Sequence, residues 1–331
     1  MNNIRVVSSY LEEQRSVAYA DFVGKKWIKG FVSTLIKNGY SLNDFDFQFI
    51  ELPDSINDTE TLFQEFVNDN VQLIICAGND SVYRLAAINR TIPMLYFGTH
   101  PENNGLEIID KQNISGVRLN LPLIWSLKNF SILKRLLPDL EEIYIPIYLL
   151  SEFDTPNVRV NHELFRAQKK GFWIPGHSSY IGYKSIHFLS ESLGCRYYEC
   201  PYITRDELET CLGQINPEKT ALIGFNDTTL LKGGVDLVLN NTRRNGIPVF
   251  WVNNFSIVKA GGVADFSSDF ERVGKLIGSM SLQLLRDNIP IEKIMFREDP
   301  AEKFSLNLKT CREMSIHVSQ EILDSFHVIE E

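Results

Sequence analysis

Short apolar runs alternate with amphipathic segments along most of this chain of 331 residues. The clearest runs are VQLIICAG (71–78), IPMLYFG (92–98) and IPVFWVNN (247–254). A short apolar run without polar alternation is typical of a strand that is buried on both faces. Between the runs, segments such as 25–38 place Trp27, Phe31 and Leu35 on one helical face. Strands that alternate with helices predict a parallel sheet covered by helices.

The alternation appears in both halves of the chain, and the length is compatible with two domains. In the second half, EEIYIPIYL (141–149), TALIGFND (220–227) and IPVFWVNN (247–254) are separated by helix-like segments. We therefore expect an α/β protein with two lobes, each a doubly wound, Rossmann-like parallel sheet. The segment 149–171 fits this pattern least well, and it could form a hairpin or an inserted short helix.

Several helix ends are marked by residues that satisfy free backbone groups. Thr59 is a predicted N-cap for a helix over 59–70, and Thr204 is a predicted N-cap for the helix in ITRDELETCLGQI (203–215). Gly39 is a predicted C-cap.

The net charge of −9 argues against a nucleic-acid partner, which would need a basic face. No apolar stretch approaches the about 18 residues of a membrane span, so we expect no direct membrane insertion. The start, MNNIRVV, lacks the charged and apolar regions of a signal peptide. We expect a cytoplasmic protein if Met1 is the native start, and a periplasmic or cell-surface protein if a leader has been removed.

The five cysteines are scattered and odd in number, which is not typical of a disulfide framework. Cys195 and Cys200 could pair, but buried free thiols are the favoured interpretation. Free thiols favour a reducing compartment.

Polar and turn-forming residues follow several of the apolar runs. In an open α/β sheet, ligands bind outside the carboxyl ends of the strands, where the next helix also offers free N–H groups. The same residue types are common there as ordinary N-caps and turns. The candidate ligand-binding residues are Ser9, Tyr10, Gly78, Asn79, Asp80, Ser81, Gly98, Thr99, His100, His177, Ser178, Ser179, Tyr180, Phe225, Asn226, Asp227, Asn253 and Asp265.

The sequence lacks the common catalytic and cofactor motifs. No G-x-G-x-x-G follows a strand, and no P-loop or G-x-S-x-G elbow occurs. GHSSY (176–180) superficially suggests a nucleophile, but a helix N-cap is favoured. The six histidines have no metal-binding spacing. We therefore expect no cofactor, no metal site, no catalytic residue and no enzymatic activity.

The order of these features resembles the substrate-binding proteins of ABC transporters, of the type that includes bacterial uptake proteins for tryptophan and tyrosine. The similarity runs over most of the chain, and its tail is the most specific part. The segments that carry it are GFVSTLIKNGY (30–40), VQLIICAGNDSVYRL (71–85), TIPMLYFGTHPE (91–102), ISGVRLNLPL (114–123), KRLLPDLEEIYI (134–145), KAGGVADFSSDFERVGKLIGSMSLQLL (259–285) and KFSLNLKTCREMSIHVSQEIL (303–323).

The resemblance implies a type I periplasmic-binding-protein fold with about three hinge crossings. These crossings are expected near 119–122, 262–265 and 297–304. The N-terminal lobe would take residues 1–119 plus about 264–292, and the C-terminal lobe 120–263 plus about 293–331. One departure is the segment 149–173, which intervenes where the family has a short Tyr-Asn-containing turn.

The implied function is the capture of a small polar metabolite, an amino acid or related compound favoured, for the membrane subunit of an ABC importer. On an amino-acid ligand, N–H groups near Gly78–Ser81 or near Ser178 and Ser179 would bind the carboxylate. Asp227 would meet the ammonium group, with Asp265 as second choice. Tyr10, Tyr180 or Phe225 would stack on the side chain. Between Asn253 and Asn254, we expect Asn253 to face the ligand.

Two other interpretations stay open. The same fold could act as a ligand-sensing regulatory module that reports to a partner. Less favoured is an α/β enzyme that acts on a small metabolite between the lobes, because fold alone does not fix function.

Overall fold

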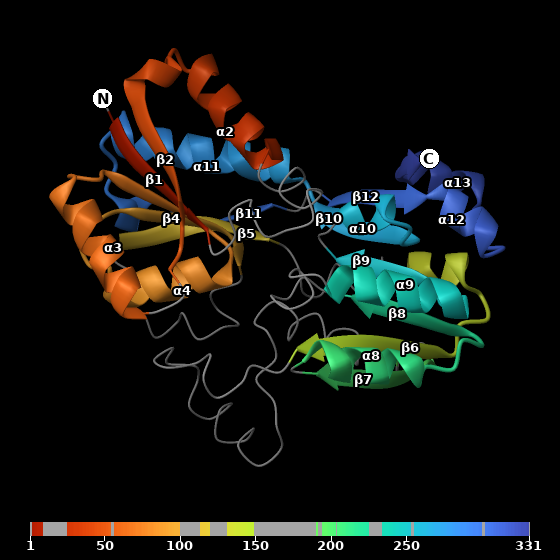
Figure 1. Cartoon of the computed structure of the whole chain (residues 1–331). Coiled ribbons are helices and arrows are strands. Elements are labelled where there is room, and N and C mark those ends of the chain that lie inside the picture. Colours follow the sequence, from red (N-terminus) through yellow and green to blue (C-terminus); the bar gives the residue numbers. More distant parts are fainter. Residues whose placement is uncertain are drawn as a thin grey trace.

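The structure of the protein is a computed structural model that describes residues 2–8, 25–53, 56–99, 113–119, 131–148, 190, 194–202, 204–224, 234–252, 255–299 and 302–330. Within these ranges the chain forms two α/β lobes, each built around one sheet (Figure 1). The predicted pair of doubly wound parallel-sheet lobes is therefore confirmed.

The sheet of the first lobe, sheet A, has six strands in the order β11-β5-β4-β3-β1-β2, and every neighbouring pair is parallel. The strands are β1 (Asn2–Ser8), β2 (Phe45–Glu51), β3 (Leu73–Ala77), β4 (Met94–Thr99), β5 (Ile114–Leu119) and β11 (Arg297–Asp299). The helices of this lobe are α2 (Lys25–Lys37), α3 (Ile56–Asn68), α4 (Asn79–Ile88) and α11 (Phe270–Leu285), with short 3-10 turns η3 (Leu42–Asp44) and η9 (Ile291–Lys293).

The sheet of the second lobe, sheet B, has seven strands in the order β13-β12-β10-β9-β8-β6-β7. β12 runs antiparallel to β10, and the other pairs are parallel. The strands are β6 (Glu142–Tyr148), β7 (Arg196–Tyr202), β8 (Thr220–Gly224), β9 (Val249–Val252), β10 (Ala264–Ser268), β12 (Glu302–Asn307) and β13 (His327–Ile329). The helices are α8 (Arg205–Gly213), α9 (Val235–Asn245), α10 (Phe255–Lys259), α12 (Leu308–Glu313) and α13 (Gln320–Ser325), with a further helical segment at 131–136.

The apolar runs become strands because both faces of each sheet are covered. In β3, Leu73 and Ile75 pack in the core under α2 and α11, whereas Ile74 and Cys76 pack in the core under α3 and α4. All four side chains have no exposed surface. Successive side chains of a strand point to opposite faces of the sheet. Because both faces of β3 are buried, the side chains on both faces are apolar and the run is continuously apolar.

The cap predictions had mixed outcomes. Thr204 accepts a hydrogen bond from the Glu207 N–H, and Glu207 accepts one from the Thr204 N–H, so the predicted N-cap is a complete capping box. Thr59 is not an N-cap, because α3 already begins at Ile56 and places Thr59 inside the helix. Gly39 follows α2 with a positive φ of 86°, as predicted for a C-cap.

The two lobe boundaries near the end of the chain differ from the prediction. We expected the chain to return to the first lobe at about residue 264, but β10 pairs with β9 and β12 in sheet B. The return comes later, when Asp269 connects β10 to α11. β11 lies in sheet A beside β5, although 293–331 was expected in the second lobe. The other predicted lobe boundaries stay predictions.

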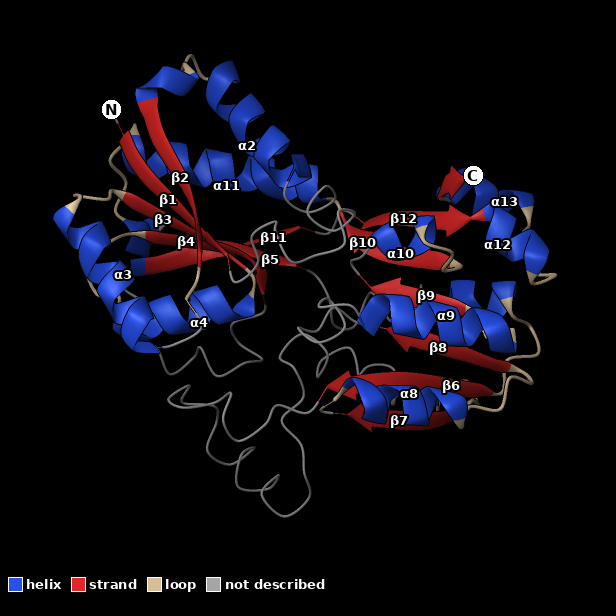
Figure 2. Ribbon diagram, viewed as in Figure 1, coloured by secondary structure: helices blue, strands red, loops and turns tan. Residues whose placement is uncertain are grey.

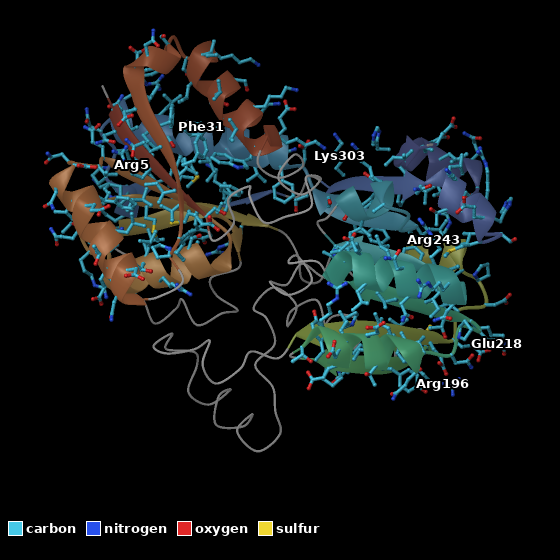
Figure 3. All side chains as sticks on the ribbon, in the orientation of Figure 1. Arg5, Phe31, Arg196, Glu218, Arg243 and Lys303 are labelled. Atoms are coloured by element: carbon cyan, nitrogen blue, oxygen red, sulfur yellow. A yellow bond between two sulfur atoms is a disulfide. The ribbon has the colours of Figure 1, made fainter. Side chains whose placement is uncertain are left out.

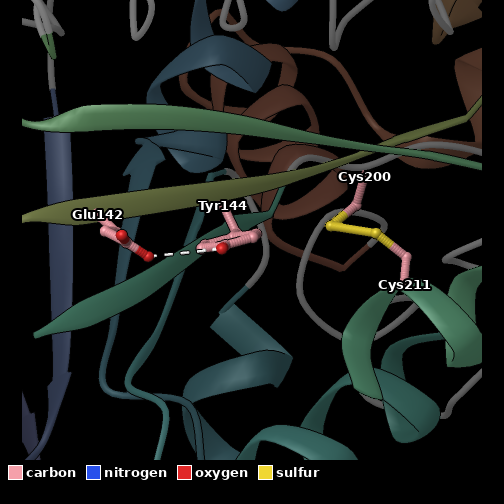
Figure 4. Close-up of a disulfide and its surroundings, with 4 residues drawn as sticks. All are labelled: Glu142, Tyr144, Cys200 and Cys211. Atoms are coloured by element: carbon pink, nitrogen blue, oxygen red, sulfur yellow. Dashed lines mark hydrogen bonds between the residues drawn. A yellow bond between two sulfur atoms is a disulfide. The ribbon is translucent and has the colours of Figure 1, made fainter. Parts of the chain in front are cut away.

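The cysteine prediction was wrong in part. Cys200 of β7 and Cys211 of α8 form a disulfide with a Cα–Cα distance of 5.8 Å (Figure 4). The disulfide links β7, an edge strand of sheet B, to α8, the helix that packs against it and follows it in the sequence. Cys76, Cys195 and Cys311 are buried free thiols, as expected.

Candidate functional site

The carboxyl ends of the parallel strands define where a site can form. In Figure 2, the strands of sheet A and the parallel strands of sheet B end towards the other lobe. Three chain passages connect the sheets: from β5 to β6, from β10 to α11, and from β11 to β12. A ligand held between these edges would therefore contact elements of both lobes.

In the first lobe, the turn after β3 is the best described part of this edge. Gly78 has φ 88° and ψ 167°, a conformation that side chains disfavour, and its N–H donates to Phe97 O at 3.1 Å. Ser81 is fully buried, and its hydroxyl lies 2.9 Å from Ala77 O and 3.0 Å from Gly78 O. These bonds fix the start of α4. Asn79 begins that helix, where backbone N–H groups are free for an anion.

Arg118 is a residue that the sequence reasoning missed. It precedes the last residue of β5, and its register partners are Thr99 on β4 and Glu298 on β11. Its guanidinium carbon lies 4.7 Å from the centroid of the Phe296 ring. Stacking on an aromatic face holds a guanidinium in place. The available signal was a cation near the end of a mostly apolar strand.

In the second lobe, Asp265 occupies β10 with no exposed surface. The Ser267 hydroxyl donates to Asp265 Oδ2. In the pairing of β10 with β9, Asp265 is the register partner of Trp251, which is one residue before the end of β9. Ser267, two residues further along β10, therefore lies beyond the end of β9. Lys303 on β12 is the cross-strand partner of Ser267 and is exposed. A buried carboxylate, a hydroxyl and an ammonium group thus share one face of two neighbouring strands.

Lys26, in the first turn of α2, belongs to the other lobe but lies within electrostatic range of this group. Burial, followed by the ammonium group of Lys303, lowers the pKa of Lys26 below its ordinary value. The carboxylate of Asp269 opposes this shift, Lys259 adds to it, and Asp265 opposes it. Charges from both lobes therefore interact beside the connection from β10 to α11.

Among the predicted site residues, the structure describes the backbone of Gly78, Asn79, Asp80, Ser81, Gly98, Thr99 and Asp265. Gly78–Ser81 and Gly98–Thr99 meet at one edge of sheet A, since β3 and β4 are neighbours, whereas Asp265 lies in sheet B. The predicted residues outside the described ranges are Ser9, Tyr10, His100, His177, Ser178, Ser179, Tyr180, Phe225, Asn226, Asp227 and Asn253.

The segment that contains Asn253 is described on both sides. Val252 ends β9, and the short helix α10 begins at Phe255. Gly261 has φ 109°, as a turn glycine can have. The turn leads into β10 of sheet B, and not directly back to the first lobe as we predicted.

Within the described ranges, no group of three or more histidine, cysteine or acidic residues is arranged to hold a metal ion. In the same part of the chain, every helix is too short or too polar to span a bilayer.

Comparison with known proteins adds structural neighbours. No family model matches the sequence, and no curated protein matches it. A conserved domain protein from Vibrio cholerae shares 13% identity over 99% of both chains, with a TM-score of 0.74. An ABC domain from Streptococcus pneumoniae, solved with L-Trp, shares 18% identity over 99% of both chains, with a TM-score of 0.72.

A further neighbour is a ligand-free, open substrate-binding protein with adhesive properties from Clostridium difficile. It shares 15% identity, the match covers 100% of this chain and 99% of that one, and the TM-score is 0.68. Transcriptional regulators of the LacI family also match, with TM-scores of 0.56 to 0.61.

These neighbours and the two parallel-sheet lobes identify the type I periplasmic-binding-protein fold, as the resemblance implied. The neighbours described by function are binding proteins and regulators.

Proposed function

We propose that this protein captures a small polar solute between its two lobes and delivers it to the membrane subunit of an ABC importer. The observation that carries the proposal is the meeting of charged groups from both lobes beside a hinge connection. Lys26 comes from the first lobe, and Asp265 and Lys303 come from the second. A solute held by both lobes binds the closed form more tightly than the open form, and this difference drives closure.

An amino acid or a related compound is our favoured solute. One neighbour of this fold was solved with L-Trp, and a more distant one is a solute-binding protein with 5-methylthioribose. The free N–H groups at the start of α4 suit a carboxylate. Asp265 is fully buried and accepts from Ser267, so we keep Asp227 as the first choice for an ammonium group.

The disulfide supports an extracytoplasmic site of action. Disulfides persist in oxidising compartments and are rare in the cytosol. Cys200 and Cys211 are paired, and the three other cysteines are buried. The disulfide therefore favours an oxidising compartment, whereas the scattered cysteines of the sequence had favoured a reducing one.

The second candidate function is a ligand-sensing regulatory module. The matches to LacI-family regulators favour it. A sensor of this kind reports through a partner, so ligand-dependent oligomerisation in solution is its distinguishing property. A transport protein would stay in the same oligomeric state with and without its solute.

A thermal-shift screen of the full chain tests the proposal. A solute at about 100 times its Kd stabilises the fold by about 2.7 kcal/mol, which gives a clear rise in melting temperature. The screen uses the amino acids, purines, short peptides and sugars. If no class raises the melting temperature, solute binding is contradicted. Recovery of the bound solute without chemical change after long incubation separates binding from catalysis.

A further inference from the structure

Sheets A and B have four edge strands, and three of these have features that oppose pairing with another chain. β11 and β13 have only three residues each. β7 is longer, but Pro201 faces its free side. The Arg196 N–H donates to Glu141 O next to β6, so the even-numbered residues of β7 face β6 and the odd-numbered ones face away. Proline at such a position has no N–H to offer to a further strand.

β2, the fourth edge strand, has seven residues and no proline. The Leu52 N–H, directly after the strand, donates to Ser8 O on β1 at 2.9 Å, so the even-numbered residues of β2 face β1. The backbone N–H and C=O groups of Phe45, Phe47 and Phe49 therefore face the free side. Among the described residues, none pairs with this outer edge. An edge strand of this kind offers a row of hydrogen-bonding groups to another strand.

Exposed apolar side chains lie beside this edge. Phe49 of β2 is 47% exposed, and Ile36 of α2 is 55% exposed. A groove of about 350 Å³, lined only by apolar residues, lies between α2 and the strands β1 and β2. Its lining includes Ile28, Val32, Phe47 and Phe49. Ile28, Val32 and Ile36 are spaced by four residues, so they form one stripe along α2. An apolar groove beside an unpaired strand indicates a protein partner.

The charge in the middle of β2 does not oppose such pairing. Asp46 pairs with Arg5 of β1, with Arg5 Nη1 3.2 Å from Asp46 Oδ2. The Arg5 side chain, labelled in Figure 3, is 3% exposed and also lies 3.5 Å from the carboxylate of Asp69. Asp46 therefore enters this surface as part of an ion pair and not as an uncompensated charge.

The two ends of β2 carry charges of opposite sign. Glu51 ends the strand and is exposed. Lys37 ends α2 and is also exposed, and it lies near the start of β2, because Tyr40 follows it and packs on Phe45 with ring centroids 5.2 Å apart. In the described part of the chain, neither Glu51 nor Lys37 has an ion-pair partner. Such a surface is complementary to its own copy turned by 180°.

We propose that β2 pairs with β2 of a second copy of this chain, antiparallel about a two-fold axis at Gln48, so that the protein is a homodimer joined through its first lobes. Residues that face the free side must stand opposite each other to exchange hydrogen bonds. An axis at Gln48 meets this condition, because it places Phe47 of one copy opposite Phe49 of the other. Aromatic pairs across strands stabilise a sheet.

The same register places the other parts of the surface together. Glu51 of one copy stands opposite Phe45 of the other, at the end of β2 where Lys37 lies. The α2 helices of the two copies lie on the same face of the joined sheet, so their apolar stripes approach each other across the axis. The interface thus covers the groove, the exposed Phe49 and the free strand edge at once.

This dimer goes beyond the proposed function and does not depend on it. All residues of the interface belong to the first lobe, so closure of the two lobes on a solute leaves them unchanged. We therefore expect the same dimer with and without solute. A change of oligomeric state on solute addition stays the property that would distinguish a sensor.

Sedimentation equilibrium on the full chain tests the dimer. The wild type should show a monomer–dimer equilibrium, and Phe49→Lys should raise its Kd by about tenfold or more, because a charge enters an apolar interface. Met295→Lys is the matched control: Met295 is 83% exposed and precedes β11, at the opposite edge of sheet A. Its dimer Kd should stay within about twofold of the wild type. Circular dichroism and the melting temperature check that each variant is folded.

A crosslink tests the register. The two Gln48 residues stand directly opposite each other as a non-hydrogen-bonded pair, with Cα atoms about 4.5 Å apart, which a disulfide can span. Gln48→Cys should therefore give a covalent dimer on mild oxidation, seen by electrophoresis without reductant. Glu51→Cys is the control on the same strand, because the two positions lie six residues apart along the joined strands, about 20 Å. It should stay uncrosslinked.

The outcomes decide the proposal. A wild type that is monomeric at every concentration contradicts it. A dimer that Phe49→Lys leaves intact, or that crosslinks through position 51 and not through position 48, uses another surface or register and overturns it. A dimer that forms only with solute contradicts an interface confined to the first lobe. Solute binding is measured separately by thermal shift, so none of these results bears on the proposed function.

Discussion

Gly274 of α11 lies against the backbone carbonyl of Trp27 in α2, so close that the two helices touch through their main chains. Gly30 of α2 makes the reciprocal contact, since a Cβ there would lie 1.9 Å from Glu271 O. The pair of helices therefore forms one rigid layer over sheet A. This layer carries Lys26 at one end, so its packing sets the position of that residue.

Gly274→Ala should destabilise the protein by about 1–3 kcal/mol, because the added methyl group must push a backbone carbonyl aside. Gly213→Ala is the matched control: Gly213 also lies in a helix, but nothing stands within 4 Å of an added Cβ. Urea denaturation would compare the free energies of unfolding. Equal losses for the two variants would contradict close helix contact.

Breaking the disulfide should lower the stability of the second lobe. Cys200 and Cys211 close a short loop, with a sequence separation of 11, and constraining such a loop in the unfolded chain is worth about 3 kcal/mol. We expect a clear fall in melting temperature when reductant is added. The double variant Cys200→Ala with Cys211→Ala is the control, since reductant should leave its melting temperature unchanged. A wild-type protein that does not respond to reductant has no such bond.

The remaining thiols should resist modification in the native state. Burial raises the pKa of Cys311 to about 12, and it also raises the pKa of Cys76, so at pH 8 both are protonated and poor nucleophiles. Mass spectrometry after alkylation should find no modified cysteine in the native protein. Unfolding without reductant should expose Cys76, Cys195 and Cys311, and unfolding with reductant should add Cys200 and Cys211. Rapid native labelling would mean that these cores open readily.

The strands and most helices could be predicted because their causes are local. The run at 71–78 is apolar at every buried position of β3, and the Thr204–Glu207 capping box is complete in four residues. Thr59 was misplaced because a threonine on a helix can also be buried, as it is here with no exposed surface. Residue type alone does not separate these two roles.

Long-range pairing explains the other errors. β10 was assigned to the wrong lobe because its position depends on pairing with β12, which is distant in sequence. The partner of Cys200 was missed for a related reason: the choice of Cys211 over Cys195 depends on how α8 packs on β7. Lys26, Arg118 and Lys303 carry no motif, and their significance comes only from neighbours that folding supplies.

Lys26 should have a measurable effect on the stability of the ligand-free protein. The pKa of Lys26 is lowered by burial and then by Lys303, so the folded state binds the Lys26 proton less tightly than the unfolded state. Wild-type stability should therefore rise as the pH increases through the folded pKa of this group, up to its unfolded value of about 10.4.

Lys26→Met removes the charge that burial disfavours and keeps an apolar side chain, so at pH 7 it should raise the free energy of unfolding of the ligand-free protein. At pH 10 the difference from the wild type should shrink, because the wild-type ammonium group is then partly neutral. Lys29→Met should show no gain, since the Lys29 ammonium pairs with Glu271. Urea denaturation at the two pH values measures both differences. A Lys26→Met variant less stable than the wild type at pH 7 would contradict this effect of burial on the Lys26 charge.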